Sequence, residues 1–140
     1  AMIGGDSIVK GYALENDSRL LVYKVGGTRQ LPAPTSFTRP PMTPPAHTAS
    51  DATIAIGAPA YETYCGTCHG AGVVGVGLLP DLRRTPYLHD ADAFAQVVLG
   101  GALAPNGMAS FASVLNQEQA QAVRAYIIMR ANQDAPANQQ

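Results

Sequence analysis

Two cysteines and a histidine stand together in the run Cys65-Gly66-Thr67-Cys68-His69. Two thiols three positions apart can form thioethers to the two vinyl groups of one porphyrin, and the next residue can place an imidazole under its iron. This spacing is typical of the attachment signal for c-type haem. The sequence therefore predicts one covalent haem c, with Cys65 and Cys68 as its anchors and His69 as an iron ligand.

Two other kinds of site also use a cysteine pair at this spacing. A structural zinc site needs four protein ligands, but the chain has no third cysteine, and its other histidines, His47 and His89, have no paired spacing. A thioredoxin-like redox pair would follow a strand, whereas a helix-like segment precedes Cys65. Haem attachment is the interpretation that these residues favour.

A haem iron held by one histidine has a sixth position that is either open or filled by a second side chain. The candidates in this chain are Met2, Met42, Met108, Met129, His47 and His89. We expect Met108, because it lies in a turn-rich loop, residues 105–111, where a side chain can point inward. Met129 falls on a predicted helix, where methionine usually fills a core. His89 precedes a predicted helix start, where a surface or capping role is more common.

The composition excludes some function classes. The chain has 140 residues with a formal net charge of −1, and only 14% of them are charged, so nothing indicates a nucleic-acid partner. No apolar run approaches the roughly 20 residues that span a bilayer. Because covalent haem attachment normally takes place on the periplasmic side, we expect a periplasmic protein from which a signal peptide has been removed.

The front of the chain divides into two segments. Residues 1–31 contain two β-rich runs around the polar turn at residues 15–18, which predicts a β-hairpin. Residues 32–50 contain six prolines, which disfavour helix and central strand and indicate an extended linker. The linker is either a mobile tether or a strap on the following domain, and the apolar side chains of Phe37 and Met42 favour the strap.

Residues 51–133 are predicted to form the haem domain, and residues 134–140 a flexible tail. Three helices are expected in the domain, at about residues 58–68, 91–99 and 117–131. The stretch between residues 70 and 86 is rich in glycine without a strong period, so we expect a loop there.

Capping signals set the ends of these three helices. Pro59 suits the first turn of the first helix, where a missing N–H costs nothing. Asp90 is the expected cap of the second helix, which should stop at the glycine pair 100–101. Asn116, with Gln119 three residues on, forms the pattern of a capping box for the third.

Residues 51–133 resemble a class I cytochrome c domain. Gly57, Tyr61 and Cys65 stand four apart as in the first helix of that family, and Val123 and Tyr126 match the positions where its last helix crosses the first. The resemblance implies a mainly α fold, with three main helices around one haem, here preceded by the β-hairpin and the proline-rich linker. In that family a glycine allows the close helix crossing and aromatic residues fill it.

Further residues are expected to surround the haem, the first of them from the resemblance and the others from their chemistry. Pro80 matches the proline whose carbonyl holds the proximal imidazole, an interaction that fixes the ring and raises its basicity. Arg83 or Arg84 is expected to pair with a haem propionate, since a guanidinium suits a carboxylate. The candidate walls of the pocket are Leu78, Leu79, Leu82, Tyr87, Phe94, Val97, Val98 and Phe111.

Three further segments, at residues 79–84, 98–101 and 106–111, resemble the C-terminal cytochrome domain of quinohaemoprotein alcohol dehydrogenases. Residues 19–32 resemble the last strand of their β-propeller, which carries pyrroloquinoline quinone (PQQ), and the start of the linker. The propeller itself is absent from this chain, so PQQ is expected only in a partner domain. The chain alone is not expected to oxidise alcohols.

Three function classes remain open from the sequence. The first is an electron-transfer domain or subunit that accepts electrons from a PQQ-dependent propeller and passes them to a quinone, a cytochrome or a copper protein. The second is an independent, diffusible periplasmic cytochrome c. The third is a haem enzyme or gas sensor with a labile sixth position. The predicted hairpin and linker favour the first, because a free carrier would not need them.

Overall fold

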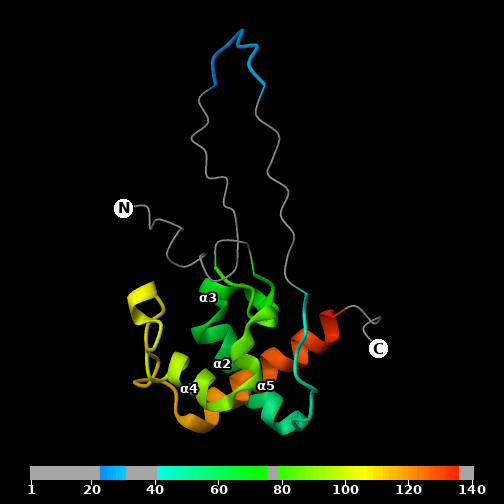
Figure 1. Ribbon diagram of the computed structural model, residues 1–140, viewed down its shortest axis with the longest axis vertical. Coiled ribbons are helices and arrows are strands. Elements are labelled where there is room, and N and C mark those ends of the chain that lie inside the picture. Colours follow the sequence, from blue (N-terminus) through cyan, green and yellow to red (C-terminus); the bar gives the residue numbers. More distant parts are fainter. Residues whose placement is uncertain (1–22, 31–40, 76–78, 136–140) are drawn as a thin grey trace.

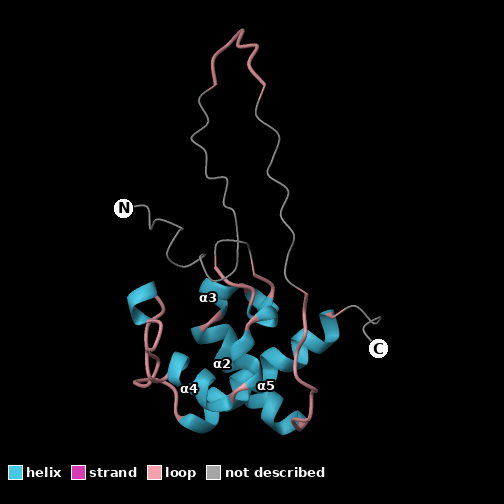
Figure 2. Ribbon diagram, in the orientation of Figure 1, coloured by secondary structure: helices cyan, strands magenta, loops and turns pink. Residues whose placement is uncertain are grey.

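The computed structural model describes residues 23–30, 41–75 and 79–135, and this part of the chain is mainly helical (Figures 1 and 2). Its α-helices are α2 (Asp51–Tyr64), α3 (Gly66–His69), α4 (Ala91–Val98) and α5 (Gln117–Asp134). Short 3₁₀ segments join them, namely η1 (Ala71–Val73), η2 (Leu82–Arg84), η3 (Pro86–His89) and η4 (Ala104–Asn106). The predicted mainly α fold is confirmed. None of the described helices is both long and apolar enough to cross a membrane.

The predicted β-hairpin is not supported. Tyr23–Val25, the end of its expected second strand, carry no strand in the structure. They lead instead into a turn in which the Gly27 N–H donates to the Lys24 carbonyl at 3.0 Å. The side chains of Tyr23 and Val25 are exposed and cover no partner surface, so nothing in this run supplies the packing that a marginal hairpin needs. The rest of the predicted hairpin lies outside the described residues.

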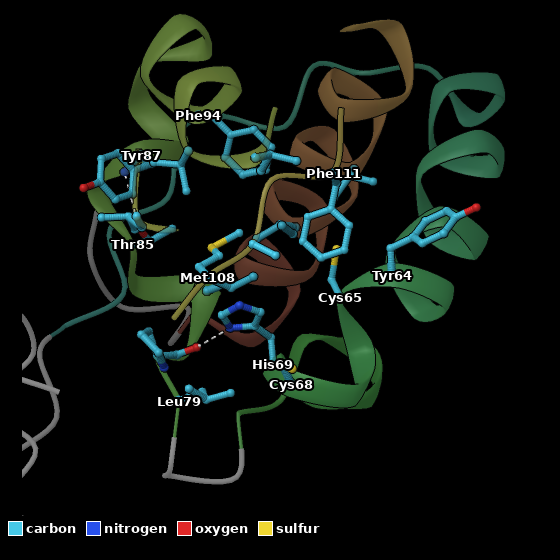
Figure 3. A pocket seen from close by; sticks show the side chains of 18 of the residues that line it. Tyr64, Cys65, Cys68, His69, Leu79, Thr85, Tyr87, Phe94, Met108 and Phe111 are labelled. Carbon is cyan, nitrogen blue, oxygen red and sulfur yellow. Dashed lines mark hydrogen bonds between the residues drawn. The ribbon is translucent and has the colours of Figure 1, made fainter. Parts of the chain in front are cut away.

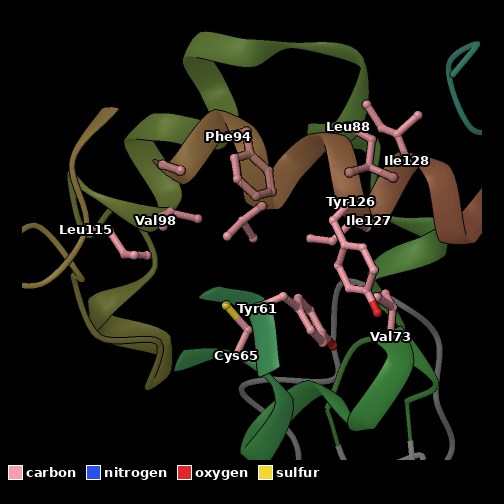
Figure 4. Close-up of a cluster of buried hydrophobic side chains, with 12 residues drawn as sticks. Tyr61, Cys65, Val73, Leu88, Phe94, Val98, Leu115, Tyr126, Ile127 and Ile128 are labelled. Carbon is pink, nitrogen blue, oxygen red and sulfur yellow. The ribbon is translucent and has the colours of Figure 1, made fainter. Parts of the chain in front are cut away.

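Helices α2 and α5 cross at Gly57, and this crossing is the centre of the fold. A Cβ atom at Gly57 would lie 2.0 Å from the backbone oxygen of Ala122, so only glycine lets the two backbones approach this closely. Next to it, the rings of Tyr61 and Tyr126 pack at 5.5 Å between centroids. The structure thus confirms the predicted glycine contact and its aromatic neighbours. Tyr61, Val123 and Ile127 are fully buried here, and Figure 4 labels Tyr61 and Ile127 in this cluster.

Helix α2 begins seven residues before the predicted start at residue 58. Ser50 caps it, with its side chain accepting from the Thr53 N–H at 3.2 Å. Pro59 therefore lies inside the helix rather than in its first turn. The helix continues through the proline because the face that contains Gly57 and Tyr61 is packed against α5, and tertiary packing outweighs the lost backbone bond.

The other predicted caps are confirmed. The Asp90 carboxylate accepts from the Asp92 and Ala93 N–H groups, both at 2.9 Å, at the start of α4. Asn116 and Gln119 form the complete capping box of α5. Helix α4 ends one residue before the predicted boundary, and α5 continues three residues beyond it, so Asp134 belongs to the helix rather than to a tail. In its described part, the loop expected between residues 70 and 86 contains the short 3₁₀ segments η1 and η2, and η3 begins at its end. Isolated turns of this kind leave no periodic signal in the sequence.

Residues 41–50 lie on the domain as a strap. The His89 ring donates from Nε2 to the Thr43 carbonyl at 2.9 Å, and the Asn132 side chain donates to the Pro45 carbonyl at 2.8 Å. Met42 and Pro44 are half-buried. Figure 1 shows this segment (cyan) running beside the C-terminal end of α5 (red). Phe37, the other residue that favoured a strap, lies outside the described residues.

Candidate haem site

An apolar cavity of about 460 Å³ lies between α3, α4, α5 and the two loops that flank α4 (Figure 3). Its volume is within the range of about 300–1,000 Å³ that ligand and cofactor sites usually have. The walls include Leu79, Leu82, Phe94, Val97 and Val98, which the sequence predicted as walls. Leu78, which was predicted with them, lies outside the described residues.

The two cysteines reach the cavity from the junction of α2 and α3. Cys65 is the C-cap of α2, and the His69 N–H donates to its carbonyl at 2.8 Å. The motif therefore forms one helical turn. Both thiols are free, with Cys65 buried and Cys68 exposed. Burial raises the pKa of the Cys65 thiol to about 11, which keeps that thiol protonated at neutral pH. The pair is thus available for thioether formation at the edge of the cavity.

The His69 imidazole enters the same cavity with a fixed orientation. Its Nδ1 hydrogen-bonds the Pro80 carbonyl at 3.1 Å, which makes Nδ1 the protonated nitrogen and gives Nε2 the free lone pair. Burial lowers the pKa of His69, and the Pro80 bond opposes that effect only in part. The ring is therefore neutral at physiological pH, the form in which imidazole binds a metal.

Met108 lines the cavity from the loop between α4 and α5 (Figure 3). Gly107 precedes it with a φ of +93°, which turns the chain, and the Met108 N–H donates to the Leu103 carbonyl at 3.2 Å. A few residues on, the Phe111 N–H donates to the Val98 carbonyl at 2.8 Å. Both ends of this loop are therefore fixed, and the half-buried Met108 thioether shares a cavity with the His69 ring.

Among the residues that the structure describes, the other candidate iron ligands do not line the cavity. His89 binds the strap, and the ring of His47 is exposed. Met129 packs against the hydrophobic core, as expected for a helical methionine, and Met42 lies in the strap. Met2 falls outside the described residues.

Of the remaining predicted site residues, Tyr87 and Phe111 line the cavity and Arg83 does not. The Arg83 guanidinium is held by Asp81 and Asp134, at 2.7 Å and 2.8 Å, so its predicted pairing with a propionate has no support here and stays a prediction. Sequence reasoning missed Tyr64, Thr85, Val123 and Ile127 as wall residues. Val123 and Ile127 belong to a set of apolar residues at near-helical spacing in the last helix. Such a stripe does not distinguish a cavity wall from core.

A buried hydrogen bond ties the motif to α2. The Tyr61 hydroxyl donates to the Gly70 carbonyl at 2.8 Å. Gly70 has a φ of +88°, and a Cβ there would lie 2.0 Å from the Val74 oxygen. The chain therefore turns sharply away from His69 at a residue whose carbonyl is anchored from α2.

We expect Tyr61→Phe to destabilise the folded chain by about 1–3 kcal/mol, because it leaves the Gly70 carbonyl buried without its donor. Denaturant unfolding of the haem-loaded protein measures this. Tyr64→Phe is the matched control, since the Tyr64 side chain is more than one-third exposed. Equal loss in the two variants would contradict a special role for the Tyr61 hydroxyl.

The cavity residues fit a c-type haem. Two thiols stand at its edge, a neutral imidazole and a thioether enter it, and most of its wall is apolar. Imidazole and thioether are the axial pair of cytochromes c. The prediction of Cys65, Cys68, His69 and Met108 as the haem-binding set therefore has a consistent geometry.

Comparison with known proteins gives the same family. Residues 52–127 match the family described as cytochrome c oxidase, cbb3-type, subunit III. Quinohemoprotein alcohol dehydrogenase ADH-IIG of Pseudomonas putida is 40% identical over 116 residues, which are 82% of this chain and 16% of that protein. The dehydrogenase subunit of alcohol dehydrogenase (quinone) from Acetobacter aceti is 36% identical, over 93% of this chain and 17% of that protein.

A solved structure of ADH-IIG from P. putida HK5 superposes with a TM-score of 0.62 at 40% identity, over 78% of this chain and 16% of that one. The chain thus spans about a sixth of the length of these relatives. Its cavity, its cysteine–histidine motif and these similarities agree: the chain belongs to the cytochrome c family and matches the C-terminal cytochrome c region of quinohaemoprotein alcohol dehydrogenases.

Proposed function

We propose that this chain transfers single electrons through one covalent haem c. The haem accepts electrons from a PQQ-dependent alcohol dehydrogenase propeller and passes them to a downstream respiratory acceptor. The observation that carries the proposal is the meeting of Cys65, Cys68, His69 and Met108 at one apolar cavity. The names of the relatives, which are quinohaemoprotein and quinone-dependent alcohol dehydrogenases, support the choice of donor.

When bound, the haem supplies an iron that is reversibly oxidised and reduced by one electron. His69 and Met108 would both ligate that iron, which leaves no open position for a substrate. A methionine ligand favours Fe(II) and raises the potential, and the apolar wall acts in the same direction because it disfavours additional positive charge. The residues of this chain therefore suit electron transfer better than oxygen chemistry or gas sensing, and the chain by itself is proposed to be non-catalytic.

The proposal is tested by the absorption spectrum and by electron uptake. After expression with a haem-attachment system, the haem should remain on the chain under denaturing conditions, because Cys65 and Cys68 hold it covalently. A sulfur-to-iron charge-transfer band should appear in the oxidised state. Stopped-flow mixing with a reduced quinoprotein alcohol dehydrogenase should then reduce the haem. Covalent haem with no reduction by any quinoprotein would reject the proposed donor but not the cofactor.

The residues at the rim of the cavity predict how strongly docking with the electron donor depends on charge. Thr67 and Cys68 are exposed, as are most residues of the loop 104–109, and none of them is charged. Gly70, which follows the motif directly, is buried. We expect the rate of haem reduction to change by no more than about twofold as ionic strength rises from about 0.01 M to about 0.1 M, where the Debye length falls from about 30 Å to about 10 Å.

A steered pair would instead lose about tenfold or more of its rate over such a range. Stopped-flow reduction at several salt concentrations separates these outcomes. A steep decrease would indicate that charged side chains guide docking, and Arg84 would then be the first to replace.

A second candidate function is an independent, diffusible electron carrier. Cytochrome c550 of Pseudomonas aeruginosa favours it, with 34% identity over 80 residues, which are 55% of each chain. Gene context distinguishes the two, since a reading frame that runs upstream into propeller repeats supports the domain of a larger enzyme. In either case we propose a periplasmic location, where covalent haem attachment takes place.

A further inference from the structure

The Pro80 carbonyl orients the His69 ring, so whatever fixes Pro80 also acts on the histidine. The carbonyl lies in a segment that is neither helix nor strand, and it accepts the His69 Nδ1–H at 3.1 Å. A carbonyl in irregular chain keeps one position only if neighbouring residues hold it. The contacts of residues 79–81 therefore determine where the Pro80 carbonyl lies.

Asp81, the residue after Pro80, is held by a two-pronged contact from Arg83. The Arg83 Nε donates to Asp81 Oδ1 at 2.8 Å, and Nη2 donates to Oδ2 at 2.7 Å. The same carboxylate also accepts the Arg83 backbone N–H at 3.1 Å and so begins η2. A bidentate guanidinium–carboxylate pair fixes direction as well as distance, so Asp81 has little freedom to rotate.

The remaining guanidinium nitrogen of Arg83 bonds to a distant helix. Its Nη1 donates to Asp134 Oδ2 at 2.8 Å, across 51 residues of chain, at the last residue of α5. Arg83 is only 8% exposed, and Arg84 and Arg130 add weaker contacts to the same two carboxylates at 3.5 Å. Burial alone would raise the pKa of Asp81, but the bonds from Arg83 outweigh it and lower that pKa. The group is therefore ionised, paired and anchored to the main scaffold helix.

We propose that Arg83 is a positioning residue for the axial histidine: the brace formed by Asp81, Arg83 and Asp134 holds the Pro80 carbonyl against His69 Nδ1 and thereby sets the basicity of the iron ligand. This inference rests on the proposed haem ligation by His69. The Nδ1–H bond gives the ring partial imidazolate character and makes it a stronger donor. When the brace is released, that bond should weaken, the ferric state should be stabilised less, and the reduction potential should rise.

The experiment uses the haem-loaded full chain and two variants. Arg83→Met removes all three side-chain hydrogen bonds of the brace. Asp134→Asn weakens the distant anchor, because it removes the charge that Arg83 and Arg130 share, and it keeps the fork on Asp81. It is the safer variant, because a carboxylate at the C-terminus of a helix is opposed by the helix dipole. Arg124→Met is the matched control, since Arg124 also ties a 3₁₀ segment to α5, through the Leu88 carbonyl, but away from Pro80.

Two readouts report on the histidine rather than on stability. In histidine-labelled protein, NMR gives the solvent-exchange rate of the His69 Nδ1 proton, which should rise about tenfold in Asp134→Asn and more in Arg83→Met if a bond of ordinary strength is loosened. Potentiometry should show an increase in the reduction potential in the same order. Arg124→Met should change neither quantity, even though it lowers the unfolding midpoint.

The outcomes separate this inference from the proposed function. If the wild-type chain holds haem with His69 as ligand, and both brace variants keep its exchange rate and potential while losing stability, the brace is structural only and the inference is wrong. If Arg83→Met does not fold, Asp134→Asn decides alone. If the wild-type chain binds no haem through His69, the proposed function fails and the inference fails with it.

Discussion

Replacing Met108 with alanine is expected to remove the sulfur-to-iron charge-transfer band from the oxidised spectrum and to lower the reduction potential. Among the methionines that the structure describes, Met108 is the one that lines the cavity shared with His69. Loss of the thioether removes a ligand that favours Fe(II). We expect a decrease on the order of 0.1 V, a modest part of the roughly 0.8 V over which axial ligands set haem potentials.

The haem should stay on the Met108→Ala protein, because Cys65 and Cys68 are untouched. Denaturing gels stained for haem check this, and redox titration gives the potential. Met129→Ala is the matched control, since Met129 packs on the core from α5 and its loss should lower stability without changing the band. A charge-transfer band that survives in Met108→Ala would show that another residue is the sixth ligand.

Gly57→Ala is expected to destabilise the fold by about 3 kcal/mol, the upper part of the usual range for overpacking. The new methyl group would lie 2.0 Å from the Ala122 oxygen and 2.5 Å from its carbonyl carbon, so α2 and α5 would have to separate. Alanine gains up to about 1 kcal/mol in helix propensity over glycine, which offsets only part of the cost. Thermal or denaturant unfolding of the haem-loaded protein measures the change.

Gly66→Ala provides the comparison for Gly57→Ala. A Cβ at Gly66 would meet the Glu62 carboxylate at 3.1 Å, and an exposed side chain can move where a helix backbone cannot. We expect the stability of Gly66→Ala to stay within about 1 kcal/mol of the wild type. If both variants lose the same stability, the close helix crossing is not the reason for the glycine at position 57.

Local chemistry made part of this structure predictable. Asp90 and Asn116 cap their helices as expected, because a capping side chain bonds backbone groups two or three residues away. The cysteine–histidine motif needs only one helical turn to be complete. The start of α2 was missed for the opposite reason: Pro59 signals a helix start locally, whereas the contact at Gly57 that carries the helix past it comes from α5.

Contacts between distant residues explain the rest of the differences. The bond from Arg83 to Asp134 was missed because the two residues are 51 positions apart and their contact follows from the packing of η2 on α5. The pairing of Arg83 or Arg84 with a haem propionate stays a prediction. The Tyr61–Gly70 bond was missed because nothing in the sequence says which hydroxyl meets which carbonyl. The β-rich pattern at the front of the chain describes residue types, and a strand forms only where a neighbouring strand accepts its hydrogen bonds.

The strap also limits how far this domain can move from anything joined ahead of it. Because Thr43 and Pro45 are bonded to His89 and Asn132, the ten residues before α2 are held on the domain and do not act as a free tether. Ten residues of extended, proline-rich chain would otherwise add about 30 Å of reach. A shorter tether would confine the haem domain to a smaller volume around any domain joined ahead of it, and the effective concentration of one domain near the other would rise. The two hydrogen bonds of the strap would then act on the frequency of encounter without touching the haem.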